Sequence, residues 1–196
     1  EAISGFRRAA TWIGRISPPE ILTFAEDEAR LMWQRGDAAF LRNWAYVYSL
    51  ARDDPGISDK FEVASLPGGP GGTASTLGGW HLMVSKYSSQ PEHAAELVRF
   101  LSSAPEQKIR AIEGSFSPTI QALYQDSEVL EAAPIFRGFE RTFKNLVLRP
   151  SAQTGAGYMR ISQEYWDAVY DVLNGYEAEE RLLEAEESMR RILARN

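Results

Sequence analysis

The sequence predicts a helix-rich fold of the α/β class, with α+β as the alternative. Most segments repeat apolar residues every three or four positions, which is the pattern of an amphipathic helix. A few short segments are either wholly apolar or have apolar and polar residues in alternation, and both patterns are typical of a strand. One long stretch, Leu66–Trp80, is too rich in glycine and proline for either element.

The chain before that stretch contains helices and short strands. Ser4 is a candidate N-cap of the first helix, and Pro18-Pro19 lies beyond its end. Three acidic residues in the first turn favour the second helix, because the helix dipole attracts negative charge there. The expected elements are helices over residues 4–14, 24–34 and 44–51 and strands over residues 38–41 and 61–66.

The chain after the stretch is mainly helical. Pro91 suits a first helical position, and Gly175 suits a helix stop. The last helix should carry Glu–Arg pairs at i,i+4 spacing, namely Glu177–Arg181, Glu186–Arg190 and Glu187–Arg191. The expected elements are a strand over residues 82–85, helices over 91–101, 105–113, 119–124, 135–143, 158–174 and 177–194, and an irregular link over 146–157.

Composition restricts the class of protein. The chain has 196 residues, enough for one large or two small domains. Its formal net charge is −6 with no basic block, which argues against nucleic acid and anionic membranes as partners. It has no cysteine, which excludes disulfides and thiolate chemistry. It opens on Glu1-Ala2 without a methionine, so we expect a piece of a longer protein.

The stretch Leu66–Trp80 should be a long loop, because six of its fifteen residues are glycine and two are proline. Long loops inside compact domains are usually either functional or disordered. The loop ends in Gly78-Gly79-Trp80, which puts a large aromatic ring beside bare backbone. Trp80 is therefore either a platform for a ligand or a core residue.

No catalytic or metal-binding motif is found. The only histidines are His81 and His93, which have no ligand partners at a metal-binding spacing. Gly69-x-Gly71-x-x-Ala74 resembles a dinucleotide fingerprint, but Pro70 and the later glycines prevent the helix it requires. Acidic pairs lie on expected exposed helix faces. We therefore expect no catalysis, no metal and no cofactor.

Four residues remain as candidates for binding a ligand. Aromatic rings can pack on the C–H face of a sugar, and a guanidinium can bind its hydroxyls. Trp44, Tyr46, Trp80 and Arg149 all lie where an expected element meets a loop, which is where binding sites occur. Each of them alone is better explained as a core or surface residue than as a binding residue.

Three motifs in order resemble the carboxy-terminal half of a known family. They are Ala38–Tyr46, Val63–Gly69 and Ser75–Trp80; the helix Gln90–Leu101 and the run Leu148-Arg149-Pro150 fit as well. The family is the extracellular solute-binding proteins of bacterial ABC sugar importers, of the maltose/trehalose-binding type. The resemblance covers nearly the whole chain, and family members are about twice as long.

The resemblance implies a part of a two-lobed periplasmic-binding-protein type II fold that closes over a sugar by a hinge. It places residues 1–65 and 116–196 in the carboxy-terminal lobe and residues 66–115 with the amino-terminal lobe. It also implies the sugar ligands: the stacking ring of Trp44 with its companion Tyr46, the backbone of Gly78 and Gly79 beside the wall of Trp80, and the guanidinium of Arg149.

The resemblance further implies a sugar, most simply a disaccharide, and the membrane permease as partners. The implied location is periplasmic or extracellular, with lipoprotein anchoring as an option in the longer protein. A piece of two lobes would leave apolar faces unpaired, so we expect the chain to self-associate. Two other classes stay open: a non-catalytic helical domain of a carbohydrate-active enzyme, and a protein-interaction module.

Overall fold

The computed structural model describes residues 1–195, except for the side chains of residues 140 and 141. It contains two compact units, which we describe separately. Unit 1 comprises Glu1–Ala29 and Arg149–Asn196, and unit 2 comprises Arg30–Leu148. The expected division into lobes concerns a longer protein and stays a prediction.

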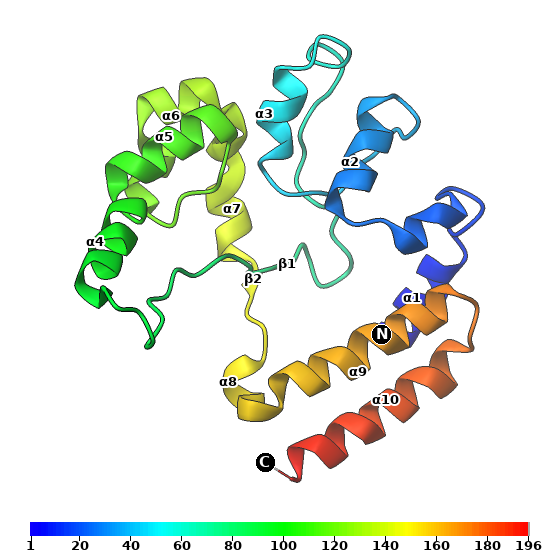
Figure 1. The fold of residues 1–196 in the computed structure, drawn as a ribbon. Coiled ribbons are helices and arrows are strands. Elements are labelled where there is room, and N and C mark those ends of the chain that lie inside the picture. Colours follow the sequence, from blue (N-terminus) through cyan, green and yellow to red (C-terminus); the bar gives the residue numbers. More distant parts are fainter. Residues whose placement is uncertain (196) are drawn as a thin grey trace. The chain divides into compact units, whose positions relative to one another are not determined.

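Unit 1 is built on the helices α9 and α10, which pack side by side (Figure 1). The buried face of α9 carries Ile161, Ala168 and Val172 at helical spacing. Gly175, with a φ of +102°, follows the end of α9, as its sequence position predicts. The elements of unit 1 are α1 (Ala2–Ala10), a 3-10 helix (Pro19–Thr23), α8 (Ser151–Thr154), a 3-10 turn (Gly155–Gly157), α9 (Tyr158–Leu173) and α10 (Ala178–Leu193).

The expected ion pairs of α10 are confirmed in two cases and wrong in one. Glu186 and Glu187 bind Arg190 and Arg191 across one turn. Arg181 instead binds Asp171 of α9 at 2.7 Å, and Glu177 caps α10 by accepting hydrogen bonds from backbone N–H groups. Capping satisfies donors that the first turn leaves unpaired, so the glutamate is engaged there rather than along the helix. The first helix begins at Ala2, so the proposed N-cap role of Ser4 is also wrong.

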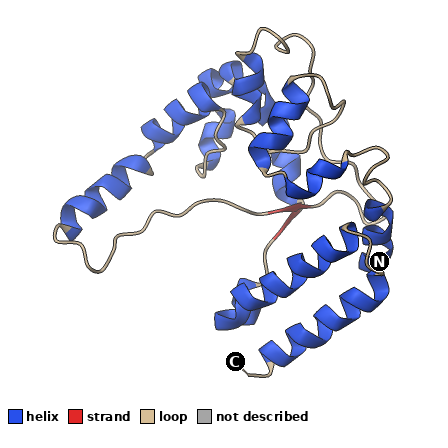
Figure 2. Cartoon of the chain, turned by 45° about the vertical axis from the view of Figure 1, so that its right-hand side comes forward, coloured by secondary structure: helices blue, strands red, loops and turns tan. Residues whose placement is uncertain are grey.

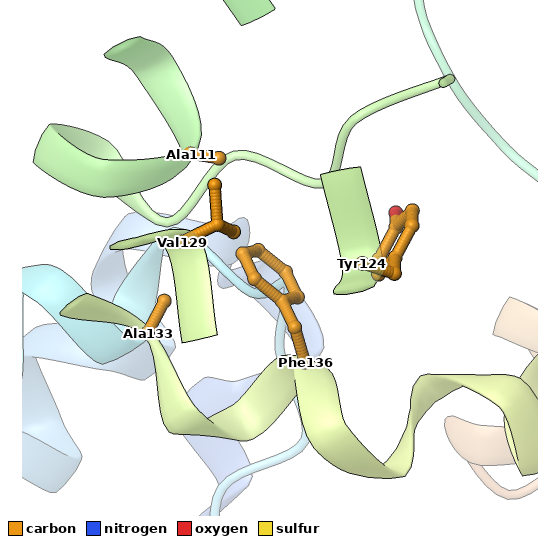
Figure 3. Close-up of a cluster of buried hydrophobic side chains, with 5 residues drawn as sticks. All are labelled: Ala111, Tyr124, Val129, Ala133 and Phe136. Atoms are coloured by element: carbon orange, nitrogen blue, oxygen red, sulfur yellow. The ribbon is translucent and has the colours of Figure 1, made fainter. Parts of the chain in front are cut away.

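Unit 2 is held by a core of buried side chains, drawn in Figure 3: Ala111, Tyr124, Val129, Ala133 and Phe136. The Phe136 ring meets the Tyr124 ring edge-on at a centroid distance of 5.4 Å. Burial raises the pKa of the Tyr124 phenol to about 12, and its hydroxyl donates a hydrogen bond to the Pro118 carbonyl at 2.8 Å. The aromatic core thus stays neutral and hydrogen-bonded.

Most helices of unit 2 lie where helices were expected, but the helix α6 (Ser127–Ala132) was not predicted, and the expected helix over 119–124 is a 3-10 helix. The helix α2 (Glu26–Gln34) crosses the division between the units. The remaining elements are α3 (Val47–Arg52), β1 (Ser75–Thr76), α4 (Pro91–Leu101), α5 (Ala104–Gly114), a 3-10 helix (Gln121–Gln125), α6 (Ser127–Ala132), a 3-10 helix (Pro134–Gly138), α7 (Phe139–Lys144) and β2 (Leu146–Val147).

The three expected strands are wrong. Residues 38–41, 61–66 and 82–85 have no strand structure, and Phe40 is exposed rather than buried. The strands present are β1 and β2, which pair in parallel with Ser75 opposite Leu146 (Figure 2). A strand exists only where a second strand supplies hydrogen bonds, and an apolar run does not specify its partner.

Asp126 joins α5 to α6 by ionic contacts and should make stability depend on pH. Its carboxylate caps α6 and binds Lys108 at 2.9 Å. Hydrogen bonding from Lys108, and then from the Val129 N–H, holds the pKa of Asp126 below its ordinary value of 3.8. The folded state therefore gains stability from this carboxylate above that ordinary pKa, and the gain is lost as the pH falls through the lower folded pKa.

We expect Asp126→Asn to be less stable than the wild type at neutral pH, and the difference to shrink below about pH 4. Urea unfolding of both chains, from neutral pH to about pH 2, measures the difference. A difference that stays constant over this range would show that the charge of Asp126 contributes nothing.

Candidate functional site

Trp44 and Tyr46 lie in a tight turn that leads into α3. The Val47 N–H donates to the Trp44 carbonyl at 3.2 Å, and the Tyr48 N–H donates to the Ala45 carbonyl at 3.0 Å. The Trp44 N–H is held by the Asn43 side chain at 2.8 Å, and the Ser49 hydroxyl donates to the Tyr46 carbonyl at 3.0 Å. Side chains and backbone together therefore fix the conformation of this turn.

The turn is anchored on the core of unit 2. Ala45, between the two aromatic residues, packs against the buried cluster of Figure 3. The neighbouring Trp44 is 52% exposed. A small residue thus faces inward while a large ring stays half in solvent on a rigid support. Such a ring can be offered to a ligand without reorganising the backbone.

Phe116 is a third aromatic residue at this position, and the sequence analysis missed it. Its ring lies nearly parallel to that of Tyr46, at a centroid distance of 6.4 Å and an interplanar angle of 20°. It follows the end of α5, in the non-helical segment 115–118. The sequence did contain a signal for this residue: a large aromatic side chain stands among glycine, serine and proline just after a helix, where binding residues occur.

The structure does not bring Trp80 to this turn. After β1, the Leu77 N–H still donates to the Val147 carbonyl at 3.0 Å, and the chain then runs as a loop until α4 (Figure 2). Trp80 is 97% exposed, so its ring contacts almost nothing. The alternative that Trp80 is a core residue is wrong, and the ligand role of Gly78, Gly79 and Trp80 stays a prediction.

Arg149 lies in unit 1, while the other five candidates lie in unit 2. Its side chain is exposed, and its carbonyl accepts a hydrogen bond from the Ser151 N–H at 2.8 Å, at the start of α8. Its role as a sugar ligand stays a prediction.

A groove with a volume of about 470 Å³ lies in unit 2, away from the candidate residues. It is lined by residues from α3, from 61–65 and from 134–142, and by none of the candidates. Its guanidinium, that of Arg52, is engaged by Asp53 at 2.7 Å and by the Ala132 carbonyl at 3.1 Å. The Phe61 ring is in edge contact with Trp33 and Tyr48. Because these groups are already engaged, the groove is a weaker candidate for binding a solute.

Within the described part of the chain, no three histidine, aspartate or glutamate side chains gather to hold a metal ion. The His93 ring instead contacts the Gln90 amide oxygen at 3.1 Å. None of the helices described has the length and apolar character that crossing a bilayer requires.

Comparison with known proteins identifies the family. The profile of the bacterial extracellular solute-binding proteins matches residues 5–108. A solved structure described as maltose-bound MalE3 of T. maritima has a TM-score of 0.90 and 33% identity over 97% of this chain. A protein described as a probable ABC transporter-binding protein of Deinococcus radiodurans is 45% identical over 175 residues, or 88% of this chain.

The chain therefore belongs to the bacterial extracellular solute-binding proteins. This confirms the resemblance inferred from the sequence and its fold class, including the periplasmic-binding-protein architecture. The family consists of binding proteins rather than enzymes and acts outside the cytoplasm. The chain spans 42% of the D. radiodurans protein and 50% of the T. maritima chain.

Proposed function

We propose that the chain is part of the solute-binding component of an ABC importer and that it binds a sugar, most simply a disaccharide or short oligosaccharide. The observation that carries the proposal is the turn of Trp44 and Tyr46, with one ring half in solvent and the intervening Ala45 on the core. A rigid aromatic face matches the C–H face of a pyranose. The sugar named for the T. maritima relative agrees with this choice.

In the proposed mechanism, the sugar stacks on Trp44 and Tyr46, and two lobes of the longer protein close over it. Residues 66–115 would belong with the amino-terminal lobe and bring the backbone of Gly78 and Gly79 and the Trp80 ring to the sugar. Arg149 would donate hydrogen bonds to its hydroxyls. The closed form would then deliver the sugar to the membrane permease. A lipid anchor and self-association of this chain remain further expectations.

The test is to titrate the natural protein that contains this chain with maltose, trehalose and glucose while following tryptophan fluorescence. The chain has five tryptophans, so a ring that meets a sugar should change the emission. We expect a saturable change with at least one disaccharide. If circular dichroism shows a folded protein and no sugar changes the emission or releases heat in calorimetry, the solute belongs to another class.

A further inference from the structure

We propose that Phe116 is a specificity-determining residue, which extends the aromatic surface of Tyr46 beside the Trp44 turn and favours disaccharides over monosaccharides. This inference rests on the proposed function and assigns a further residue to the same site. It follows from three features of unit 2: the position of the Phe116 ring, the backbone that sets it there, and the glycine that leaves room for it.

The Phe116 ring continues the surface that Tyr46 begins. The two rings are separated by 6.4 Å and inclined by 20°, so they form an offset parallel pair. Phe116 is nevertheless 56% exposed. Its contact with Tyr46 therefore leaves much of the ring accessible to a ligand.

The end of α5 fixes where Phe116 lies. Ser115 has a φ of +52°, the only positive φ among the described residues other than glycine. The Ser115 N–H donates to the Ala111 carbonyl at 3.1 Å, and the Phe116 N–H donates to the Arg110 carbonyl at 3.3 Å. This is the left-handed helix ending that glycine usually supplies. Ser115 is fully buried, and within the described residues its hydroxyl has no hydrogen-bond partner.

Gly114 leaves the space that the ring occupies. A Cβ atom at this position would lie 2.6 Å from Cε2 and 2.7 Å from Cδ2 of Phe116. Side chains do not approach so closely, so any larger residue at 114 would push the ring away. The segment Gly114–Phe116 therefore combines an unusual backbone, a buried serine and a glycine that cannot be replaced without moving the ring on Tyr46.

This arrangement matches a ligand with two sugar rings. One pyranose presents a single C–H face and can cover only part of the paired rings of Tyr46 and Phe116. A second pyranose would add apolar contact at Phe116, because its C–H face and the exposed part of the ring would both be removed from water. Removing Phe116 should therefore weaken disaccharides more than glucose. A role in folding alone would instead change stability and weaken all sugars equally.

The experiment measures the dissociation constants of maltose, trehalose and glucose by calorimetry for the natural protein and four variants. Phe116→Leu removes the ring, Phe116→Tyr keeps it, and Gly114→Ala displaces it. Phe100→Leu is the matched control, because Phe100 is 60% exposed on α4 in the same unit. We expect Phe116→Leu and Gly114→Ala to weaken the bound disaccharide about three- to tenfold more than glucose. Phe116→Tyr and Phe100→Leu should leave this ratio unchanged.

The possible failures are distinguishable. If the natural protein binds none of the three sugars, the proposed function fails and the inference fails with it. If it binds a disaccharide and Phe116→Leu changes the ratio no more than Phe100→Leu, only the inference is overturned. Should Phe116→Leu fail to fold, Gly114→Ala decides the question, because it keeps the phenylalanine and moves its ring.

Discussion

Replacing Phe136 with alanine is expected to lower the free energy of unfolding of unit 2 by about 4 kcal/mol. Phe136 is among the largest fully buried side chains. Its ring contacts those of Tyr124 and Phe139 at centroid distances of 5.4 Å and 5.1 Å. The substitution removes the apolar contact of a whole ring and leaves a cavity that the surrounding side chains can fill only in part. Urea unfolding monitored by circular dichroism measures the loss.

Phe100→Ala is the control for this prediction, because Phe100 is exposed on α4 and should cost less than about 0.5 kcal/mol. Equal losses in the two variants would contradict the core described for unit 2. Because Ala45 packs on the same cluster, we also expect Phe136→Ala to weaken sugar binding without touching a ligand.

Replacing Trp44 with alanine is expected to weaken sugar binding about 30-fold, which corresponds to roughly 2 kcal/mol. Trp44 is half in solvent on an anchored turn, so its ring would become buried only when a ligand covers it. An aromatic residue that becomes fully desolvated on binding typically contributes a large share of the affinity. Calorimetry is the appropriate measurement, because the substitution also removes a fluorescent group.

Trp166→Ala is the matched control for Trp44→Ala. Trp166 lies on α9 in unit 1 and is 57% exposed, close to the exposure of Trp44. Its loss should leave the dissociation constant unchanged. A 30-fold effect at Trp166, or none at Trp44, would move the sugar away from the turn of Trp44 and Tyr46.

Most of the helices could be predicted from the sequence because their signals are local, whereas the short helices α6 and α8 were missed. Pro91 and Gly175 mark a start and a stop, and apolar residues three and four apart define the faces of α4 and α9. The strands could not be predicted, because Ser75 pairs with Leu146 across seventy residues of chain and no local pattern announces that partner.

For the candidate site as well, residues with a local signal were found and a residue placed only by the fold was missed. Trp44 and Tyr46 were found because an element was expected to meet a loop there and because Ala38–Tyr46 resembles a motif of the family, although the strand expected at 38–41 is absent. Phe116 was missed because only the folded end of α5 places it on Tyr46. Trp80 could be recognised as unusual beside two glycines, but its environment depends on contacts that the sequence alone does not specify.

The packing of Ala45 against the core bears on how the binding properties of related proteins could come to differ. The side chain of Ala45 is a single methyl group. The cluster that it packs against contains two further alanines, Ala111 and Ala133. Adding one or two carbon atoms at any of the three is expected to shift the packing beneath the turn, while Trp44 and Tyr46 themselves stay unchanged. Under the proposed function, selection for a new sugar could therefore act first on these alanines, beneath the proposed binding surface.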